Sequence, residues 1–215
     1  MKTSKSNLEG HPMSQEYSGK NQYEIEIDLN YKPYESILTR LQNNISTDDR
    51  YQFADLLIKQ EFEKEDDSFA HIFKKVVLLN SLYSTNIFAP FNVALKISRV
   101  KNFSERMRKG DISLVDEIRI NTINGSTRDF YSFSTKYCHH HNPTKYPIYD
   151  SIVVDVLVDS LKELEPHGKV NKSKMKDYEY FKEKVDYLAK LWDLSDNYLY
   201  TKLDKYLWHK GREER

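Results

Sequence analysis

The sequence predicts an all-α protein folded as a single helical domain, and three observations favour this class. The 215 residues include only 6 glycines and 6 prolines, whereas sandwiches and barrels need many turn residues. Hydrophobic residues make up 39% of the chain and charged residues 31%, which is typical of a polar globular protein with one core. Beyond Tyr34, apolar residues recur every three or four positions, which is the period of amphipathic helices.

The chain is expected to begin with a polar tail and one extended segment. Residues 1–22 are polar, lack periodicity and contain no apolar stretch, so we expect a disordered tail and not a secretory signal. The helical domain is then expected over residues 23–215. Residues 23–29 alternate between apolar and polar side chains, as a strand does, and residues 37–45 return to a helical stripe.

Capping residues and a proline mark the helices in the middle of the chain. Short oxygen-bearing side chains at residues 46–49 and 66–68 can accept orphan backbone N–H groups, and so they predict helix starts. Pro90 fits the first turn of a further helix. The helices expected here span residues 53–62, residues 69–82 and a segment from Pro90 to Gly110.

The second half contains a turn, a helix, a short extended piece and another helix. Asn124–Thr127 is a turn that leads into a helix over residues 128–140, and this helix stops before Pro143 because the residue before a proline avoids the helical region. Tyr146–Tyr149 is expected to be extended, and Asp150 opens the next helix. Further helices are expected at residues 114–120, 178–191 and 199–207.

The helix expected over residues 128–140 combines an apolar face with a polar one. Steps of four from Arg128 reach Ser132, Lys136 and His140, and this face either lines a cleft or is an ordinary solvent-facing side. Asp150 is equally open to two interpretations. A carboxylate at a helix start accepts backbone N–H bonds and feels the positive end of the helix dipole, whether it is a simple cap or a functional group.

Two stretches carry a resemblance to a known family. Tyr131–Tyr137 and Tyr146–Ser151 resemble the end of the helix-hairpin-helix DNA glycosylase module, closest to the 8-oxoguanine glycosylase branch and its distant bacterial relatives. The resemblance covers residues 112–160 well and the helices from residue 67 more loosely. Residues 203–208 are also similar to a segment found in bacterial proteins of this kind.

The resemblance implies a reaction and a set of site residues. Asp150 would be the catalytic carboxylate, which stabilises an oxocarbenium-like sugar or orients the attacking water, while the target nucleotide is flipped out of the duplex. Around it, Arg128, Ser132 and Lys136 would line the site or hold phosphate. The remaining candidates are His140, on the polar face, and Tyr146 and Tyr149, which would pack the flipped base or shape its pocket.

The chain departs from the family pattern at the hairpin. The family hairpin reads like Gly-x-Gly followed by a lysine, whereas residues 124–128 lack the second glycine and end in Arg128. Arginine stays protonated and cannot form the Schiff base of the bifunctional members. We therefore expect a degenerate hairpin and a monofunctional glycosylase that leaves an abasic site. Lys136, two turns farther along the helix, is a possible substitute nucleophile, but we favour a phosphate contact or a surface charge for it. The target base would be an oxidised purine, or a modified base in phage DNA if the protein is a defence enzyme.

Charge and composition bear on partners and compartment. The net charge is zero, but 10 basic and 5 acidic residues lie between Leu95 and Lys145, which indicates either a DNA-binding face or solvated helix faces. We expect a monomer that binds double-stranded DNA and needs no cofactor. Cys138 is the single cysteine and no apolar run reaches the ~20 residues of a membrane span, so we expect a cytoplasmic protein.

Two other interpretations compete with a glycosylase. The run Cys138–His141 contains zinc-ligand residue types, but adjacent helical residues point in different directions, and no second ligand pair follows, so we expect no metal site. A non-catalytic helical binding module is the alternative function. In that case Asp150 is only a cap, and the basic segment Arg99–Lys109 meets an acidic partner.

Overall fold

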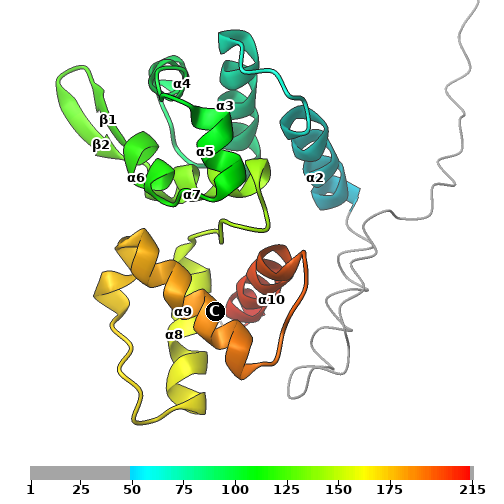
Figure 1. Cartoon of the computed structure of the whole chain (residues 1–215), viewed down its shortest axis with the longest axis vertical. Coiled ribbons are helices and arrows are strands. Elements are labelled where there is room, and N and C mark those ends of the chain that lie inside the picture. The colour runs from blue at the N-terminus through cyan, green and yellow to red at the C-terminus, as the bar shows by residue number, and fades with distance from the viewer. Residues whose placement is uncertain (1–48, 214–215) are drawn as a thin grey trace, which may run out of the picture.

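The computed structural model describes residues 49–213 and confirms a mostly helical protein. The tail expected at residues 1–22, the strand at 23–29 and the stripe at 37–45 lie outside the described residues. The described helices form two groups, with α2 to α7 and a β-hairpin in one group and α8 to α10 in the other (Figure 1). A linker, residues 142–150, joins the groups; it consists of a turn at residues 143–145 and a stretch without helix or strand at residues 146–150.

The first group begins with five helices, and two of them start at the predicted signals. Ser68 caps α3 by accepting a hydrogen bond from the His71 backbone N–H, and Pro90 occupies the first turn of α4. The segment expected from Pro90 to Gly110 is two helices, because Asn102 adopts a left-handed conformation (φ 53°) between them. The bounds are α2 (Asp49–Phe62), α3 (Phe69–Tyr83), α4 (Pro90–Ile97), α5 (Phe103–Lys109) and α6 (Ser113–Arg119).

A β-hairpin stands where the sequence predicted the start of a helix. Strands β1 (Ile120–Ile123) and β2 (Ser126–Asp129) pair antiparallel, and they are joined by Asn124 (φ 50°) and Gly125 (φ 77°). Two consecutive positive φ angles are those of the type I′ turn, whose twist matches that of paired strands. The expectation of a helix from Arg128 is therefore wrong: Arg128 is an exposed residue of β2, opposite Asn121.

Helix α7 (Tyr131–His141) is the central helix of the first group. It contacts α2, α3 and α6, so almost every side chain from Tyr131 to His139 is buried. The polar face predicted on this helix is consequently not a solvent-facing side. Lys136, in the middle of it, is only 5% exposed. A lysine is rarely buried to this extent unless it is paired, and its partners define the site described below.

The second group consists of α8 (Ser151–Leu164), a 3₁₀ turn η1 (Lys172–Lys176), α9 (Tyr178–Leu191) and α10 (Leu199–Glu213). Helices α8 and α10 approach closely at Gly211, where an added Cβ would lie 2.5 Å from Cγ2 of Ile152. This contact packs α10 against the first turns of α8 and thus near Asp150. None of the helices in residues 49–213 has the length and apolar character that crossing a bilayer requires.

Candidate active site at the start of helix α8

Three side chains hold the linker in an extended conformation just before Asp150. His139 Nδ1 lies 2.7 Å from the Tyr146 carbonyl oxygen, and the Tyr178 hydroxyl donates to the Pro147 carbonyl at 2.9 Å. The backbone N–H of Tyr149 donates to Oγ1 of Thr135 at 3.0 Å. Because two of these side chains come from α7, the linker is fixed against that helix.

His139 connects the linker, α7 and α10. A carbonyl oxygen only accepts hydrogen bonds, so His139 Nδ1 carries the proton, and Nε2 is left to accept from the Thr201 hydroxyl at 3.2 Å. Burial lowers the pKa of His139 to about 4, which keeps the ring neutral at physiological pH. The imidazole is thus a fixed structural bridge between both groups of helices.

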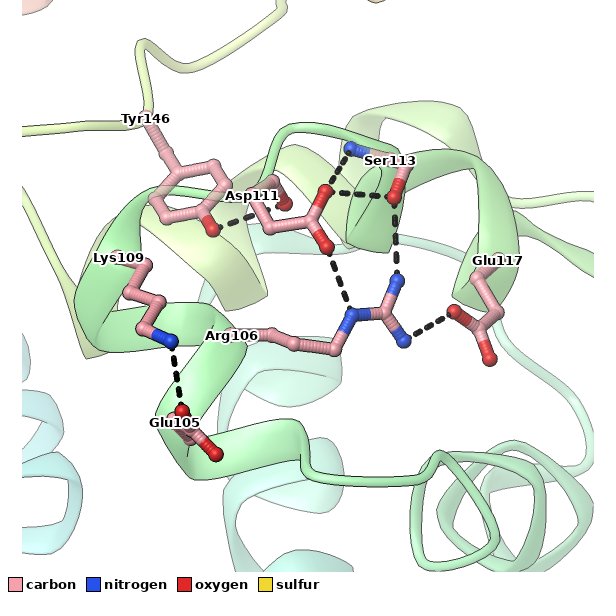
Figure 2. A network of polar contacts seen from close by, with 7 residues as sticks. All are labelled: Glu105, Arg106, Lys109, Asp111, Ser113, Glu117 and Tyr146. Carbon is pink, nitrogen blue, oxygen red and sulfur yellow. Dashed lines mark hydrogen bonds and ion pairs between the residues drawn. The ribbon is translucent and has the colours of Figure 1, made fainter.

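Tyr146 supports the linker and does not reach the site. Its ring is fully buried, and its hydroxyl donates to the Asp111 carbonyl at 3.0 Å. Figure 2 shows this bond beside the Arg106 guanidinium, which binds the Asp111 and Glu117 carboxylates at 2.7 and 2.6 Å. The prediction that Tyr146 packs a flipped base is therefore corrected, because its ring has no accessible surface with which to do so.

Asp150 caps α8, as predicted, and has one carboxylate oxygen left over. Its Oδ1 accepts the backbone N–H of Ile152 at 2.9 Å, and this bond completes the cap. Its Oδ2 lies 3.6 Å from Nζ of Lys136, and the side chain is 28% exposed. The cap explains only Oδ1; the other oxygen belongs to an ion pair at the junction between the two groups of helices.

Lys136 is the buried partner of Asp150. Its side chain is 6% exposed, and Nζ donates to Oγ of Ser132 at 2.7 Å and lies 5.4 Å from the centre of the Tyr83 ring. Burial lowers the pKa of Lys136, while the Asp150 carboxylate raises it. The hydroxyl of Tyr83 in turn lies 3.0 Å from Nε2 of His140, so α3 also borders the site.

Helices α2 and α10 contribute three further charged groups. Lys205 on α10 binds Asp55 on α2 at 2.8 Å. Asp204, next to Lys205, is partly exposed, and burial raises its pKa to about 7, with the Asp150 and Asp55 carboxylates acting in the same direction. Asp204 lies within residues 203–208, the segment that is similar to one found in bacterial proteins of the glycosylase kind.

The structure brings together some of the predicted residues and not others. Lys136 pairs with Asp150 and donates to Ser132, whereas His140 contacts the Tyr83 hydroxyl and has no printed contact with Asp150. Tyr149 is half-buried beside Asp150, with its ring centre 4.4 Å from that of Tyr131. Arg128 is an exposed residue of β2, and among residues 49–213 it forms no ion pair with this cluster; the hairpin that carries it lies at the left of the first group (Figure 1).

The histidine run of α7 is divided between separate surroundings. His139 bridges to α10, His140 contacts Tyr83, and His141 packs edge-on against Phe62 and Phe103. Cys138 is buried, and burial raises the pKa of its thiol. Among residues 49–213, no group of three or more His, Cys, Asp or Glu side chains is arranged to hold a metal ion.

Comparisons with known proteins identify the family. Residues 34–145 match the model of HI_0787_N, an N-terminal domain. A Haemophilus influenzae protein described only as uncharacterized is 35% identical over 196 residues, which cover 86% of this chain and 93% of the relative. No solved structure matches the chain significantly. The chain therefore belongs to this family, and the matched domain includes Lys136 but ends before Asp150.

Proposed function

We propose that this member of the HI_0787 family is a DNA glycosylase of the helix-hairpin-helix type that hydrolyses the N-glycosidic bond of a damaged or modified base. The observation that carries the proposal is the Asp150 carboxylate. It is partly exposed, held at a helix N-terminus and paired through Oδ2 with the buried Lys136. A simple cap would need neither the ion pair nor the burial of a lysine beside it.

The position of Asp150 suits the stabilisation of positive charge. Loss of a base from a nucleotide leaves an oxocarbenium-like sugar, and a fixed carboxylate close to that sugar lowers the energy of the transition state. Asp150 is fixed by the Ile152 N–H bond and by the clamped linker. It requires no reorganisation as charge develops, which is the condition for a large electrostatic contribution to the rate.

The relative exposure of the two paired residues favours hydrolysis over a lysine adduct. The Asp150 side chain is 28% exposed, whereas that of Lys136 is 6% exposed and already bonded to Ser132. Asp150 is thus the group that an incoming sugar would meet first. The proposed product is therefore an abasic site.

Exposed basic side chains support DNA as the partner. Five cations of the segment that carries the positive excess are exposed and form no ion pair with any described residue. These are Arg99, Lys101, Arg108, Arg128 and Lys145. Unpaired surface cations bind phosphates by releasing counterions, which gives a salt-dependent affinity for duplex DNA. The proposed substrate is an oxidised purine or a modified base of phage DNA; on the alternative function, the same face of a non-catalytic module binds an acidic protein.

Base release tests the proposal directly. The protein is incubated with labelled duplexes containing 8-oxoguanine, uracil or an alkylated base, and with phage genomic DNA that carries modified cytosine. Strand breaks are then scored with and without alkali. We expect alkali-dependent breaks that disappear in Asp150→Asn. Breaks without alkali, together with a borohydride-trapped adduct lost in Lys136→Gln, would show that Lys136 is a nucleophile.

A matched control separates catalysis from capping. Asp177 caps α9 through the Tyr180 N–H, as Asp150 caps α8, but it lies outside the cluster around Lys136. Asparagine is as good a cap as aspartate, so both variants should fold. Asp177→Asn should keep full activity, and Asp150→Asn should still bind DNA. Equal activity of the two variants would refute the role of Asp150.

A further inference from the structure

The turn between α8 and α9 carries a concentration of positive charge that the candidate site does not use. Residues 167–176 contain no carboxylate and four lysines, namely Lys169, Lys172, Lys174 and Lys176. All four are exposed, and among residues 49–213 only Lys172 of this set forms an ion pair, with Asp155 on α8 at 2.6 Å. Three like charges thus lie close together in the chain without a carboxylate partner, which favours the binding of an anion there.

A buried methionine fixes the backbone of this turn. Met175 lies between Lys174 and Lys176 and is completely buried, whereas both lysines are exposed. The ammonium group of Lys174 lies 5.9 Å from the centre of the Tyr180 ring, a contact that leaves its charge open to solvent. Because Met175 anchors the chain in the core, the two lysines on either side of it are held on the outer face of the turn.

Two hydrogen bonds tie the turn to the first group of helices. The Tyr131 hydroxyl donates to the Met175 carbonyl at 3.1 Å. The Arg119 guanidinium donates to the Lys176 carbonyl at 2.9 Å, so the turn lies at the boundary between the two groups, where α9 begins beneath α6 in Figure 1. Arg119 also binds both carboxylate oxygens of Asp129, at 2.9 and 2.6 Å, and the charge of this carboxylate is therefore already matched.

Tyr131 also connects the turn to the start of α8. Its ring centre lies 4.4 Å from that of Tyr149, and Tyr149 directly precedes Asp150. One pair of tyrosine rings thus separates the Met175 carbonyl from the residue before Asp150. A DNA strand carries a phosphate about every 3.4 Å along the helix axis. A strand whose target sugar lies at Asp150 therefore has flanking phosphates within reach of long side chains on this turn.

We propose that Lys174 and Lys176 bind the phosphates of the DNA strand that flank the target nucleotide. The inference rests on DNA as the partner in the proposed function, and it adds a DNA contact on the second group of helices, outside the positive segment between Leu95 and Lys145. Lysine binds a phosphate as a point charge on a flexible stem, so exposed and unpaired ammonium groups are sufficient for this contact. Each phosphate contact releases counterions, and the affinity therefore falls as the salt concentration rises.

The salt dependence of DNA binding tests this contact without requiring base release. Binding of the full chain to a fluorescent duplex with a tetrahydrofuran abasic-site analogue is measured by anisotropy over a series of NaCl concentrations. For Lys174→Gln combined with Lys176→Gln, the slope of log K against log[salt] should become shallower by about 2, since each phosphate contact contributes about 0.9. The matched control is Lys74→Gln combined with Lys190→Gln. It removes the same charge from two exposed lysines of α3 and of the far end of α9, and the slope should stay at the wild-type value.

Single-turnover base release supplies the second readout. In the variant of the turn, the rate at saturating protein should not change, because Asp150 is untouched, whereas the protein concentration that gives half of this rate should rise. An unchanged melting temperature is the check of folding, since glutamine keeps most of the lysine stem.

The outcomes separate the phosphate contact from the proposed function. An unchanged salt slope in the variant of the turn, or an equal change in both double variants, would overturn the contact and leave the glycosylase proposal intact. A shallower slope in the variant of the turn alone, without base release by the wild-type protein from any substrate, would support the contact and overturn the glycosylase proposal. Failure of the wild-type protein to bind duplex DNA would overturn both.

Discussion

Protonation of His139 should destabilise the fold in mild acid, because this ring bridges the linker, α7 and α10. In the folded state its Nδ1 donates to Tyr146 and its Nε2 accepts from Thr201, so a second proton on Nε2 would break the bond to Thr201. The pKa of His139 is lowered from 6.5 to about 4 by burial. Below pH 6.5 this residue binds a proton in the unfolded chain but stays neutral in the folded chain. The free energy of unfolding therefore decreases as pH falls toward 4.

The magnitude follows from the two pKa values. With one residue titrating at 6.5 in the unfolded chain and at about 4 in the folded chain, the loss between pH 7 and pH 5 is about 2 kcal/mol. Asp204 changes stability in the same pH range with the opposite sign, because its folded pKa is raised to about 7 and its contribution is fully present only below pH 3.8. The effect of His139 must therefore be isolated by substitution and not read from the wild-type curve alone.

Urea unfolding of His139→Asn and of the wild-type protein at pH 7 and pH 5 isolates the effect. Asparagine keeps a donor for the Tyr146 carbonyl but does not titrate. The variant should be less stable than wild type at pH 7, and its free energy of unfolding should depend less on pH, by about 2 kcal/mol over this interval. An unchanged pH dependence would refute the description of His139 as a buried neutral bridge.

Three further substitutions test the geometry. Gly211→Ala should cost about 1–3 kcal/mol, because its methyl group would lie 2.5 Å from Ile152, and thermal unfolding measures the loss; an unchanged melting temperature would mean that α8 and α10 are less closely packed. Thr135→Val keeps the side-chain volume but leaves the Tyr149 N–H without an acceptor, which should cost about 1–3 kcal/mol in urea unfolding. The same change should slow any base release that depends on Asp150. Loss of stability without loss of activity would mean that this hydrogen bond holds the linker but does not position Asp150. Gly125→Ala places a side chain at φ 77° in the hairpin turn and should cost about 1 kcal/mol in thermal unfolding; an unchanged melting temperature would mean that the turn tolerates a side chain there.

The local sequence was sufficient for most helices. Side-chain oxygens, prolines and the apolar period marked where α3, α4 and α8 begin, because caps and first turns depend on residues only a few positions apart. The extended linker was also predictable, since the prolines at 143 and 147 disfavour helix there. The hairpin was missed although Asn124-Gly125 is a strong signal for a two-residue turn, because each strand has only four residues and β2 is polar and exposed throughout, with no alternating pattern to mark it.

The sequence predicted which residue types could form the site but not which of them are buried together. Periodicity placed Ser132, Lys136 and His140 on one face of a helix, and the resemblance added Asp150. Neither the periodicity nor the resemblance could show that this face is buried, because burial depends on α2 and α3 packing over it. Residue type alone also gave Tyr146 a place in the site, whereas its burial and its bond to Asp111 assign it to the support of the linker.

The sequence by itself determined the helical class, the capping of α8 by Asp150 and the identity of the residues able to do chemistry. Only the tertiary structure decided which charges meet. Lys205 and Asp55 are 150 positions apart, and Nζ of Lys205 donates to Oδ2 of Asp55 at 2.8 Å. The physical reason is range: caps and turns are set by neighbours in the chain, whereas the pKa of a carboxyl group depends on every charge and every low-dielectric surface that folding brings close to it.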